Sequence, residues 1–234
     1  MRNIQAIFIK QIQSYVKKPQ LFITPLMFLG LAFVFTLFAD GGEDAGYPWE
    51  LVNQLSVMFL GIGTMMTASS FVWEDWGTMN LRFMSMAGVK STQYLVATGG
   101  ALIPISFIVL FLFGVIGGYM GNGMFIFLGL TMLGAVASIL FGLTLALLPE
   151  KISPIAGSTL PFVVGFAPMI SEGSDEVATI FYFLFTQQIN VALDGFMEYG
   201  TDPTHSFYIV LANIGVILVA FAAIQIKNGP NWHK

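Results

Sequence analysis

The chain has 234 residues, of which 56% are hydrophobic and only 9% are charged, whereas a soluble domain carries about 25% charged residues. Its nine basic and thirteen acidic residues give a net charge of −4, which excludes the cationic surface of a nucleic-acid-binding domain. The lack of cysteine excludes disulfides, thiolate metal sites and cysteine nucleophiles. The composition therefore excludes an ordinary soluble enzyme and predicts an all-α polytopic membrane protein.

The first element is a helix that does not cross the membrane. Hydrophobic side chains recur at helical spacing with polar residues between them, at Ile4, Phe8, Ile12 and Tyr15. We predict an interfacial amphipathic helix over residues 1–18, ended by Pro19, and a six-helix transmembrane domain over residues 19–234. A cleaved signal peptide is the competing interpretation, but residues 37–39, Leu-Phe-Ala, are not a small-x-small cleavage site.

Six apolar stretches follow, and a helix needs about 20 such residues to cross about 30 Å of hydrocarbon. The predicted spans are Leu21–Phe38, Leu51–Trp73, Tyr94–Gly118, Met124–Leu148, Ile155–Ile170 and Ser206–Ile226. The fifth contains Pro161 and Pro168, which predict a kinked or broken helix.

The loop between the second and third spans, residues 74–92, is the most informative segment. Thr78, followed by Leu81 and Phe83, predicts a short amphipathic helix that Gly88 ends. A helix that projects from the membrane in this way can bind a soluble partner. The alternative is a loop that is merely solvated.

Residues 171–200 separate the fifth and sixth spans. An apolar run over residues 180–185 is followed by polar side chains, at Gln187, Gln188, Asn190 and Asp194. Because polar side chains are costly in lipid, we predict a re-entrant or interfacial helical hairpin on the outer face. A seventh span is the alternative, and it would place Lys227 outside.

The charges predict the orientation of these spans. All nine basic residues fall on one side of the six-span arrangement: Arg2, Lys10, Lys17, Lys18, Arg82, Lys90, Lys151, Lys227 and Lys234. Ten acidic residues fall on the other side: Asp40, Glu43, Asp44, Glu50, Glu172, Asp175, Glu176, Asp194, Glu198 and Asp202. Since basic residues collect in the cytoplasm, we predict a multi-pass protein of a bacterial inner (plasma) membrane with both termini cytoplasmic.

Few residues suggest reaction chemistry. His205 and His233 stand in no metal-spaced motif, and no G-x-S-x-G motif is present. Residues 88–92 lack the upstream glycine and the Gly-Lys step of a phosphate-binding loop. We therefore predict no catalytic, cofactor-binding or metal-binding residue on this chain. No charge lies in the middle of a predicted span, which argues against proton-coupled transport.

Asp75, Gly77 and Thr78 match the acidic-x-Gly-Thr element of the ABC type-2 permease family. The interfacial helix, the six spans and the hairpin between spans five and six resemble that family over nearly the whole chain. Residues 86–89, Met-Ala-Gly-Val, stand where the family often has Pro-Val or Pro-Leu. A weaker resemblance links this short permease to bacterial exporters of amphipathic or antimicrobial peptides, of the phenol-soluble-modulin type.

The resemblance implies that residues 74–92 dock on a separate ATPase subunit, which would hold the ATP and Mg. The implied coupling residues are Glu74, Asp75, Gly77, Thr78, Leu81, Arg82 and Phe83. It further implies a pair of permease copies, most simply a homodimer in membrane lipid. Gly134, Ser138 and Gly142 line one helical face that would suit either this dimer or packing within one subunit.

The implied activity is export of a hydrophobic or amphipathic substrate, with peptides among the candidates. For the substrate path we expect residues of the second and fifth spans, namely Asn53, Met58, Met65, Phe162 and Phe166. Three other classes stay open at this point. One is a small secondary transporter or channel that works without an ATPase, and another is a non-transporting immunity or assembly subunit. The third is a membrane enzyme, which would need a reactive group of side chains that the sequence does not reveal.

Overall fold

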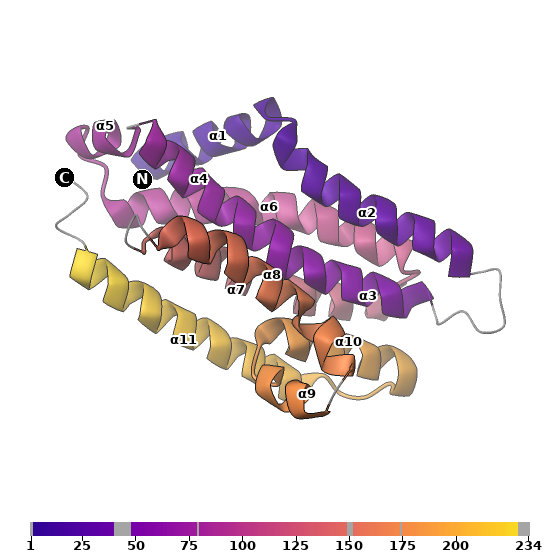
Figure 1. Ribbon diagram of the computed structural model, residues 1–234. Helices are drawn as coiled ribbons and strands as arrows, with labels where there is room; N and C mark the ends of the chain where they lie inside the picture. The colour runs from indigo at the N-terminus through magenta and orange to yellow at the C-terminus, as the bar shows by residue number, and fades with distance from the viewer. Residues whose placement is uncertain (1, 40–47, 79, 149–151, 174, 229–234) are drawn as a thin grey trace.

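A computed structural model of the chain describes residues 2–39, 48–78, 80–148, 152–173 and 175–228. All regular secondary structure in these residues is helical (Figure 1), which confirms the all-α fold class. The elements are α1 (Arg2–Lys17), α2 (Gln20–Ala39), α3 (Pro48–Met58), the π-helix η1 (Phe59–Thr64), α4 (Met65–Gly77), α5 (Asn80–Met86), α6 (Ser91–Ile116), α7 (Asn122–Ala146), α8 (Ser153–Glu172), α9 (Asp175–Phe181), α10 (Phe185–Tyr199) and α11 (Thr204–Asn228).

Within the described residues, five helical runs are long and apolar enough to cross a membrane. They are Leu21–Phe38, Trp49–Gly77, Thr92–Ile116, Asn122–Ala146 and Thr204–Ile224. The predicted fifth span corresponds to α8, a single helix that contains both Pro161 and Pro168. Its apolar part, Ile155–Ser171, is shorter than the other five. The apolar helices are consistent with a membrane protein.

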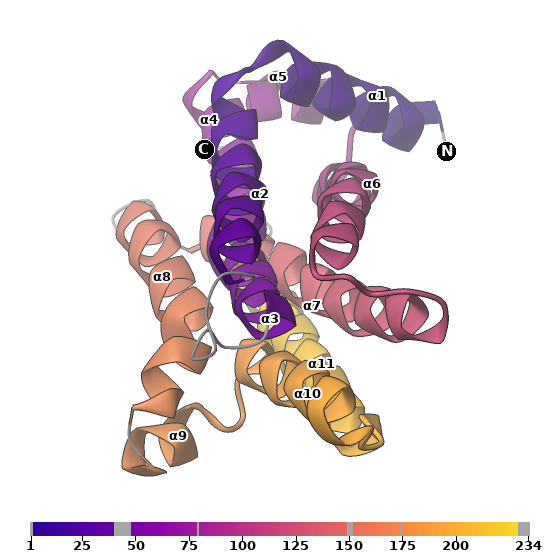
Figure 2. The ribbon, with the colours of Figure 1, turned by 90° about the vertical axis from the view of Figure 1, so that its right-hand side faces the viewer.

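The long helices lie lengthwise beside one another, and the short helices lie at the two ends (Figure 1). α1, α5 and the C-terminal end of α11 share one end, while α9 and α10 lie toward the other. Viewed along the bundle, α1 extends from the end of α2 and lies over the end of α6 (Figure 2). Five of the charged residues that predict the orientation of the spans lie outside the described residues: Asp40, Glu43, Asp44, Lys151 and Lys234.

The run Trp49–Gly77, formed by α3, η1 and α4, is the centre of the bundle. The most apolar part of this run is 78% buried, compared with 17% for α2 and 6% for α11. Its α4 part packs against α7, and its η1 part packs against α8. The second predicted span is therefore the packing core, whereas α2 and α11 leave most of their apolar surface uncovered by this chain.

Two glycine contacts set how closely the central run approaches its neighbours. A Cβ on Gly61 in η1 would lie 2.3 Å from the Cα of Gly165 in α8. A Cβ on Gly142 in α7 would lie 2.4 Å from the carbonyl oxygen of Met65 in α4. A Cβ on Gly134 would lie 2.4 Å from the Ile189 side chain and 2.8 Å from the Leu60 side chain. Gly134 and Gly142 of the predicted small-residue face thus pack against other helices of this chain.

Two hydrophobic clusters fill the bundle. One brings together residues of α2, α3, η1, α6, α7 and α10, with Phe113, Phe127 and Ile189 among its buried members. The second joins α1, α4, α6 and α7, and it contains Tyr15, Phe71 and other buried residues. This second cluster fixes α1 against α6 at the end of the bundle that carries α5.

Candidate functional site

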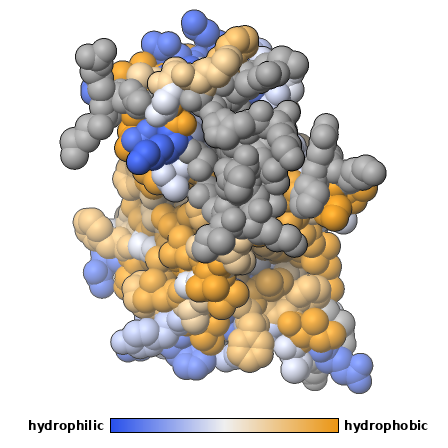
Figure 3. Space-filling view, turned by 90° about the vertical axis from the view of Figure 1, so that its left-hand side faces the viewer, coloured by the Kyte–Doolittle hydropathy of each residue, from blue (hydrophilic) through white to orange (hydrophobic). Residues whose placement is uncertain are grey.

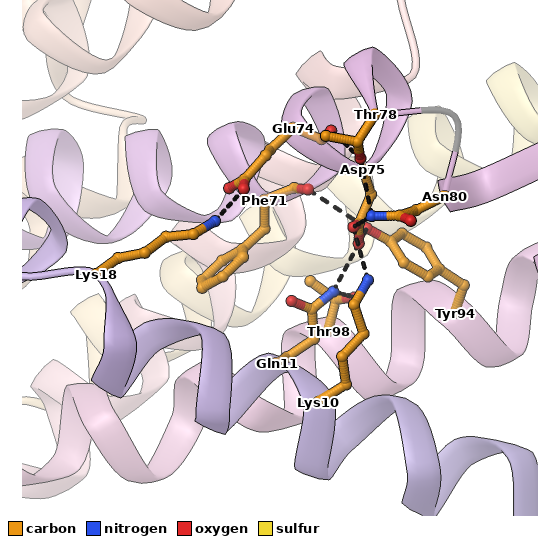
Figure 4. A network of polar contacts seen from close by, with 10 residues as sticks. All are labelled: Lys10, Gln11, Lys18, Phe71, Glu74, Asp75, Thr78, Asn80, Tyr94 and Thr98. Atoms are coloured by element: carbon orange, nitrogen blue, oxygen red, sulfur yellow. Dashed lines mark hydrogen bonds and ion pairs between the residues drawn. The ribbon is translucent and has the colours of Figure 1, made fainter.

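Asp75 is the centre of a polar cluster at the end of α4 (Figure 4). The residue is only 6% exposed. Its Oδ1 accepts hydrogen bonds from Lys10 Nζ at 2.7 Å and from Asn80 Nδ2 at 3.2 Å. Its Oδ2 accepts hydrogen bonds from Gln11 Nε2 at 3.0 Å and from the Tyr94 hydroxyl at 2.8 Å. Both carboxylate oxygens are therefore satisfied by side chains of this chain.

The Asp75 cluster fastens four helices to one another. Lys10 and Gln11 belong to α1, Asp75 to α4, Asn80 to α5 and Tyr94 to α6. A buried carboxylate is costly unless it is paired and hydrogen-bonded, and hydrogen bonds to an ionised group are stronger than neutral ones. Because all the partners converge on one carboxylate, its removal would loosen the four helices together.

The chain leaves α4 in a tight turn that places α5. The Thr78 backbone N–H donates to the Glu74 carbonyl oxygen at 3.0 Å, and the Thr78 hydroxyl donates to the same oxygen at 2.8 Å. Asn80 Nδ2 also donates to Thr78 Oγ1, at 2.8 Å. Asn80 thereby links the turn to Asp75.

α5 ends where the sequence predicts. Gly88 has φ +78°, a left-handed conformation that favours glycine after a helix. The Val89 N–H donates to the Met84 carbonyl oxygen at 3.0 Å, which is the six-to-one bond of a Schellman motif. Residues 86–89 therefore give α5 a defined end without a proline.

The C-terminal end of α4 and the helix α5 expose three large hydrophobic side chains, which we call the α5 surface. Trp76 is 41% exposed, Phe83 63% and Met86 68%. Viewed from the end of the bundle that carries α5, hydrophobic side chains gather below the centre of the face, and hydrophilic ones lie toward its margins (Figure 3). Clustered exposed hydrophobic side chains are typical of interaction sites.

A second set of contacts holds α1 to α4. Lys18 forms an exposed ion pair with Glu74. The Tyr15 ring packs against Phe22 and Phe71, and its hydroxyl donates to the Leu21 carbonyl oxygen at 3.2 Å. Burial raises the pKa of Tyr15, so its hydroxyl stays a neutral donor. The turn from α1 into α2 is therefore anchored on both sides.

The structure separates the implied coupling residues into buried and exposed groups. Asp75 is buried, whereas Glu74, Gly77, Thr78 and Phe83 are exposed. Leu81 and Arg82 belong to α5, but their side chains lie outside the described part of the structure. Asp75 is thus placed to position the exposed residues rather than to touch a partner.

Sequence reasoning missed four of the residues that complete the Asp75 cluster. Lys10, Gln11, Asn80 and Tyr94 come from three separate helices, and Thr98 extends the cluster through Gln11 at 3.4 Å. Of these residues, only Lys10 could have been suspected from the sequence, because it is one of the polar residues of the predicted amphipathic helix. The sequence carries no sign that α1 would pack on α6 and reach Asp75.

The expected substrate-path residues differ in their burial. Asn53 and Met65 are buried in the core of the chain, Met58 and Phe166 are half-buried, and Phe162 is exposed. Phe162 and Phe166 stack along α8 with ring centroids 6.4 Å apart.

Asn53 instead joins a polar cluster that reaches α10. Its Nδ2 donates to Asp194 Oδ1 at 2.8 Å, and Asn190 Nδ2 donates to Asp194 Oδ2 at 2.8 Å. The Tyr119 hydroxyl donates to Asn53 Oδ1. This Asp194 cluster ties the central run to the predicted hairpin.

Among the described residues, no group of three or more His, Cys, Asp or Glu side chains is placed to hold a metal ion. The Asp75 cluster is a buried hydrogen-bond network around a carboxylate that links several helices. The exposed α5 surface lies beside it. Comparisons with protein-family models, with curated proteins and with solved structures find no significant match for this chain.

Proposed function

We propose that the chain is the transmembrane permease subunit of an ATP-driven ABC exporter, driven by a separate ATPase subunit. The observation that carries this proposal is the Asp75 cluster, which links the exposed α5, through Asn80 and Asp75 of α4, to residues of α1 and α6. A partner that pushed on a loosely tethered loop would move only that loop. A partner bound to the α5 surface would instead act on several helices at once.

The transport cycle follows from this linkage. Closure of the ATPase pair on ATP would draw the α5 surfaces of two permease copies together. The Asp75 cluster would pass that movement to α1 and α6, and the bundle would change from an inward to an outward conformation. The cargo that suits the proposal is hydrophobic or amphipathic, and peptides are the leading candidates.

The proposal includes an arrangement in the membrane. α8 would be the sixth span, residues 171–200 the outer hairpin, and residues 74–92 the cytoplasmic coupling loop of a bacterial plasma-membrane protein. α1, α5 and the C-terminal end of α11 share one end of the bundle (Figure 1), which supports cytoplasmic placement of both termini. The uncovered apolar surface of α2 and α11 leaves room for a second copy in a homodimer.

Phe83→Asp is expected to abolish ATPase coupling, because it replaces an exposed hydrophobic side chain of the α5 surface with a charge. The test is co-expression with a candidate ABC ATPase, one with a Walker A loop, followed by co-purification and measurement of ATP hydrolysis. We expect at least a tenfold loss of bound ATPase, about 1.4 kcal/mol of binding free energy. Tyr199→Asp is the matched control, since Tyr199 is equally exposed but lies in α10. Normal coupling in well-expressed Phe83→Asp would overturn the proposal.

A second candidate function is ion-coupled transport without an ATPase. The observation that favours it is Asp194, an ionisable residue that α10 brings against buried Asn53 in the central run. In this case Asp194→Asn would abolish uptake or efflux driven by a pH gradient in proteoliposomes that contain the chain alone. A permease of the ABC type would show no transport in those vesicles with either sequence.

A further inference from the structure

A groove of about 370 Å³ lies between α6, α7 and α11. Apart from Thr92, its lining residues are apolar side chains and glycines. α6 and α7 approach closely beside it, because a Cβ on Gly99 would lie 3.3 Å from Ile139 and 3.4 Å from Leu143. The groove is therefore suited to an apolar occupant rather than to a polar solute.

The extent of the groove matches one leaflet of a bilayer. Along α6 it runs from Thr92 to Ile103, and eleven helical steps of about 1.5 Å make roughly 17 Å. One leaflet supplies about half of the roughly 30 Å of hydrocarbon. Thr92 lies one residue inside α6, so the groove begins at the end of the bundle that carries α5. An extended acyl chain would lie parallel to the helix along this path.

Positive charge lies at the end where the groove begins. Lys90 is exposed and immediately precedes α6. The first N–H groups of a long helix have no carbonyl partner within it and carry partial positive charge. The side chain of Gln93 accepts a hydrogen bond from the Lys90 N–H at 3.2 Å, which defines the start of the helix. This end therefore favours a negatively charged headgroup over a zwitterionic one.

We infer that the groove binds an acyl chain of an anionic phospholipid, with the lipid phosphate at Lys90 and the N-terminus of α6. The inference rests on the proposed membrane location of the helices but not on the ATPase partner. The bound lipid would lie where α6, α7 and α11 meet, next to Tyr94 of the Asp75 cluster.

Val96→Trp tests the groove itself. Val96 lines the groove and is 64% exposed, so an indole there fills the mouth without entering the core. Ile108→Trp is the matched control, because Ile108 is 60% exposed on the same helix but does not line the groove. In native mass spectrometry of the full chain with added phosphatidylglycerol, we expect Val96→Trp to lower lipid binding at least about tenfold. Ile108→Trp is expected to bind as the natural chain does.

Lys90→Ala tests the charge. It is expected to lower phosphatidylglycerol binding about fivefold and to leave phosphatidylcholine binding unchanged. Equal binding of the two lipids by the natural chain would overturn the inference, as would equal losses in the Val96 and Ile108 variants. If Val96→Trp changes the fraction of dimer but leaves lipid binding intact, the groove binds a second copy of the chain. That result would overturn the lipid inference. Should Val96→Trp fail to fold, Leu218→Trp fills the groove from α11 and gives the same readout.

Discussion

Asp75→Ala is expected to lower the free energy of unfolding by about 3 kcal/mol, the lower end of the range for breaking a buried ion pair. The truncation removes the carboxylate acceptor of three hydrogen bonds, those from the Lys10 ammonium, the Gln11 amide and the Tyr94 hydroxyl. Lys10 is partly exposed, so water recovers part of the loss. For a chain of this size the change corresponds to a fall of about 6–12 °C in Tm, measured by thermal unfolding of the purified full chain.

Glu74→Ala is the matched control for that variant. Glu74 is the neighbouring residue and forms an ion pair with Lys18, but it is exposed. Exposed ion pairs contribute about 0–1 kcal/mol, so we expect a fall in Tm of less than about 4 °C. Equal falls in the two variants would show that burial of Asp75 contributes nothing. A double-mutant cycle with Lys10→Ala is expected to give a coupling energy of about 1–3 kcal/mol.

Gly61→Leu is expected to disrupt the packing of η1 on α8. The Cβ would lie 2.3 Å from the Cα of Gly165 and 2.5 Å from its backbone nitrogen. Backbone atoms cannot rotate away, so the two segments must separate. Overpacking of a core costs about 1–3 kcal/mol, and we expect this variant to lose at least about 3 kcal/mol. The measurements are Tm and the yield of monodisperse protein in size-exclusion chromatography.

Gly129→Leu separates this steric effect from the general effect of replacing a glycine in an apolar helix. Gly129 lies in α7, and a Cβ added there meets no atom within 4 Å. Since leucine favours the helix by about 1 kcal/mol over glycine, we expect an unchanged or raised Tm. Gly61→Ala is the milder test, with a smaller loss in the same direction. A Gly61→Ala protein as stable as the natural chain would contradict the close contact of η1 and α8.

Patterns local to the chain were predictable. The helical spacing of apolar residues in the first segment predicts α1, and continuous apolar runs predict the long helices, because each run must satisfy its backbone hydrogen bonds internally. The end of α5 near Gly88 was also predictable, because glycine favours the left-handed conformation that often follows a helix. The π-helix η1 was not predictable in this way, and it lies where Gly61 meets Gly165.

The composition by itself determined the class of protein. With 9% charged and 56% hydrophobic residues, the chain offers several helices that suit a bilayer, and the acidic-x-Gly-Thr element marked the segment around Asp75 as a candidate site. What Asp75 does was decided only by the tertiary structure. Its partners stand 64 and 65 residues before it and 5 and 19 residues after it, and only the packing of α1 on α6 brings them together. Sequence patterns report periodicity within one helix, whereas a buried charge is stabilised by groups from several helices.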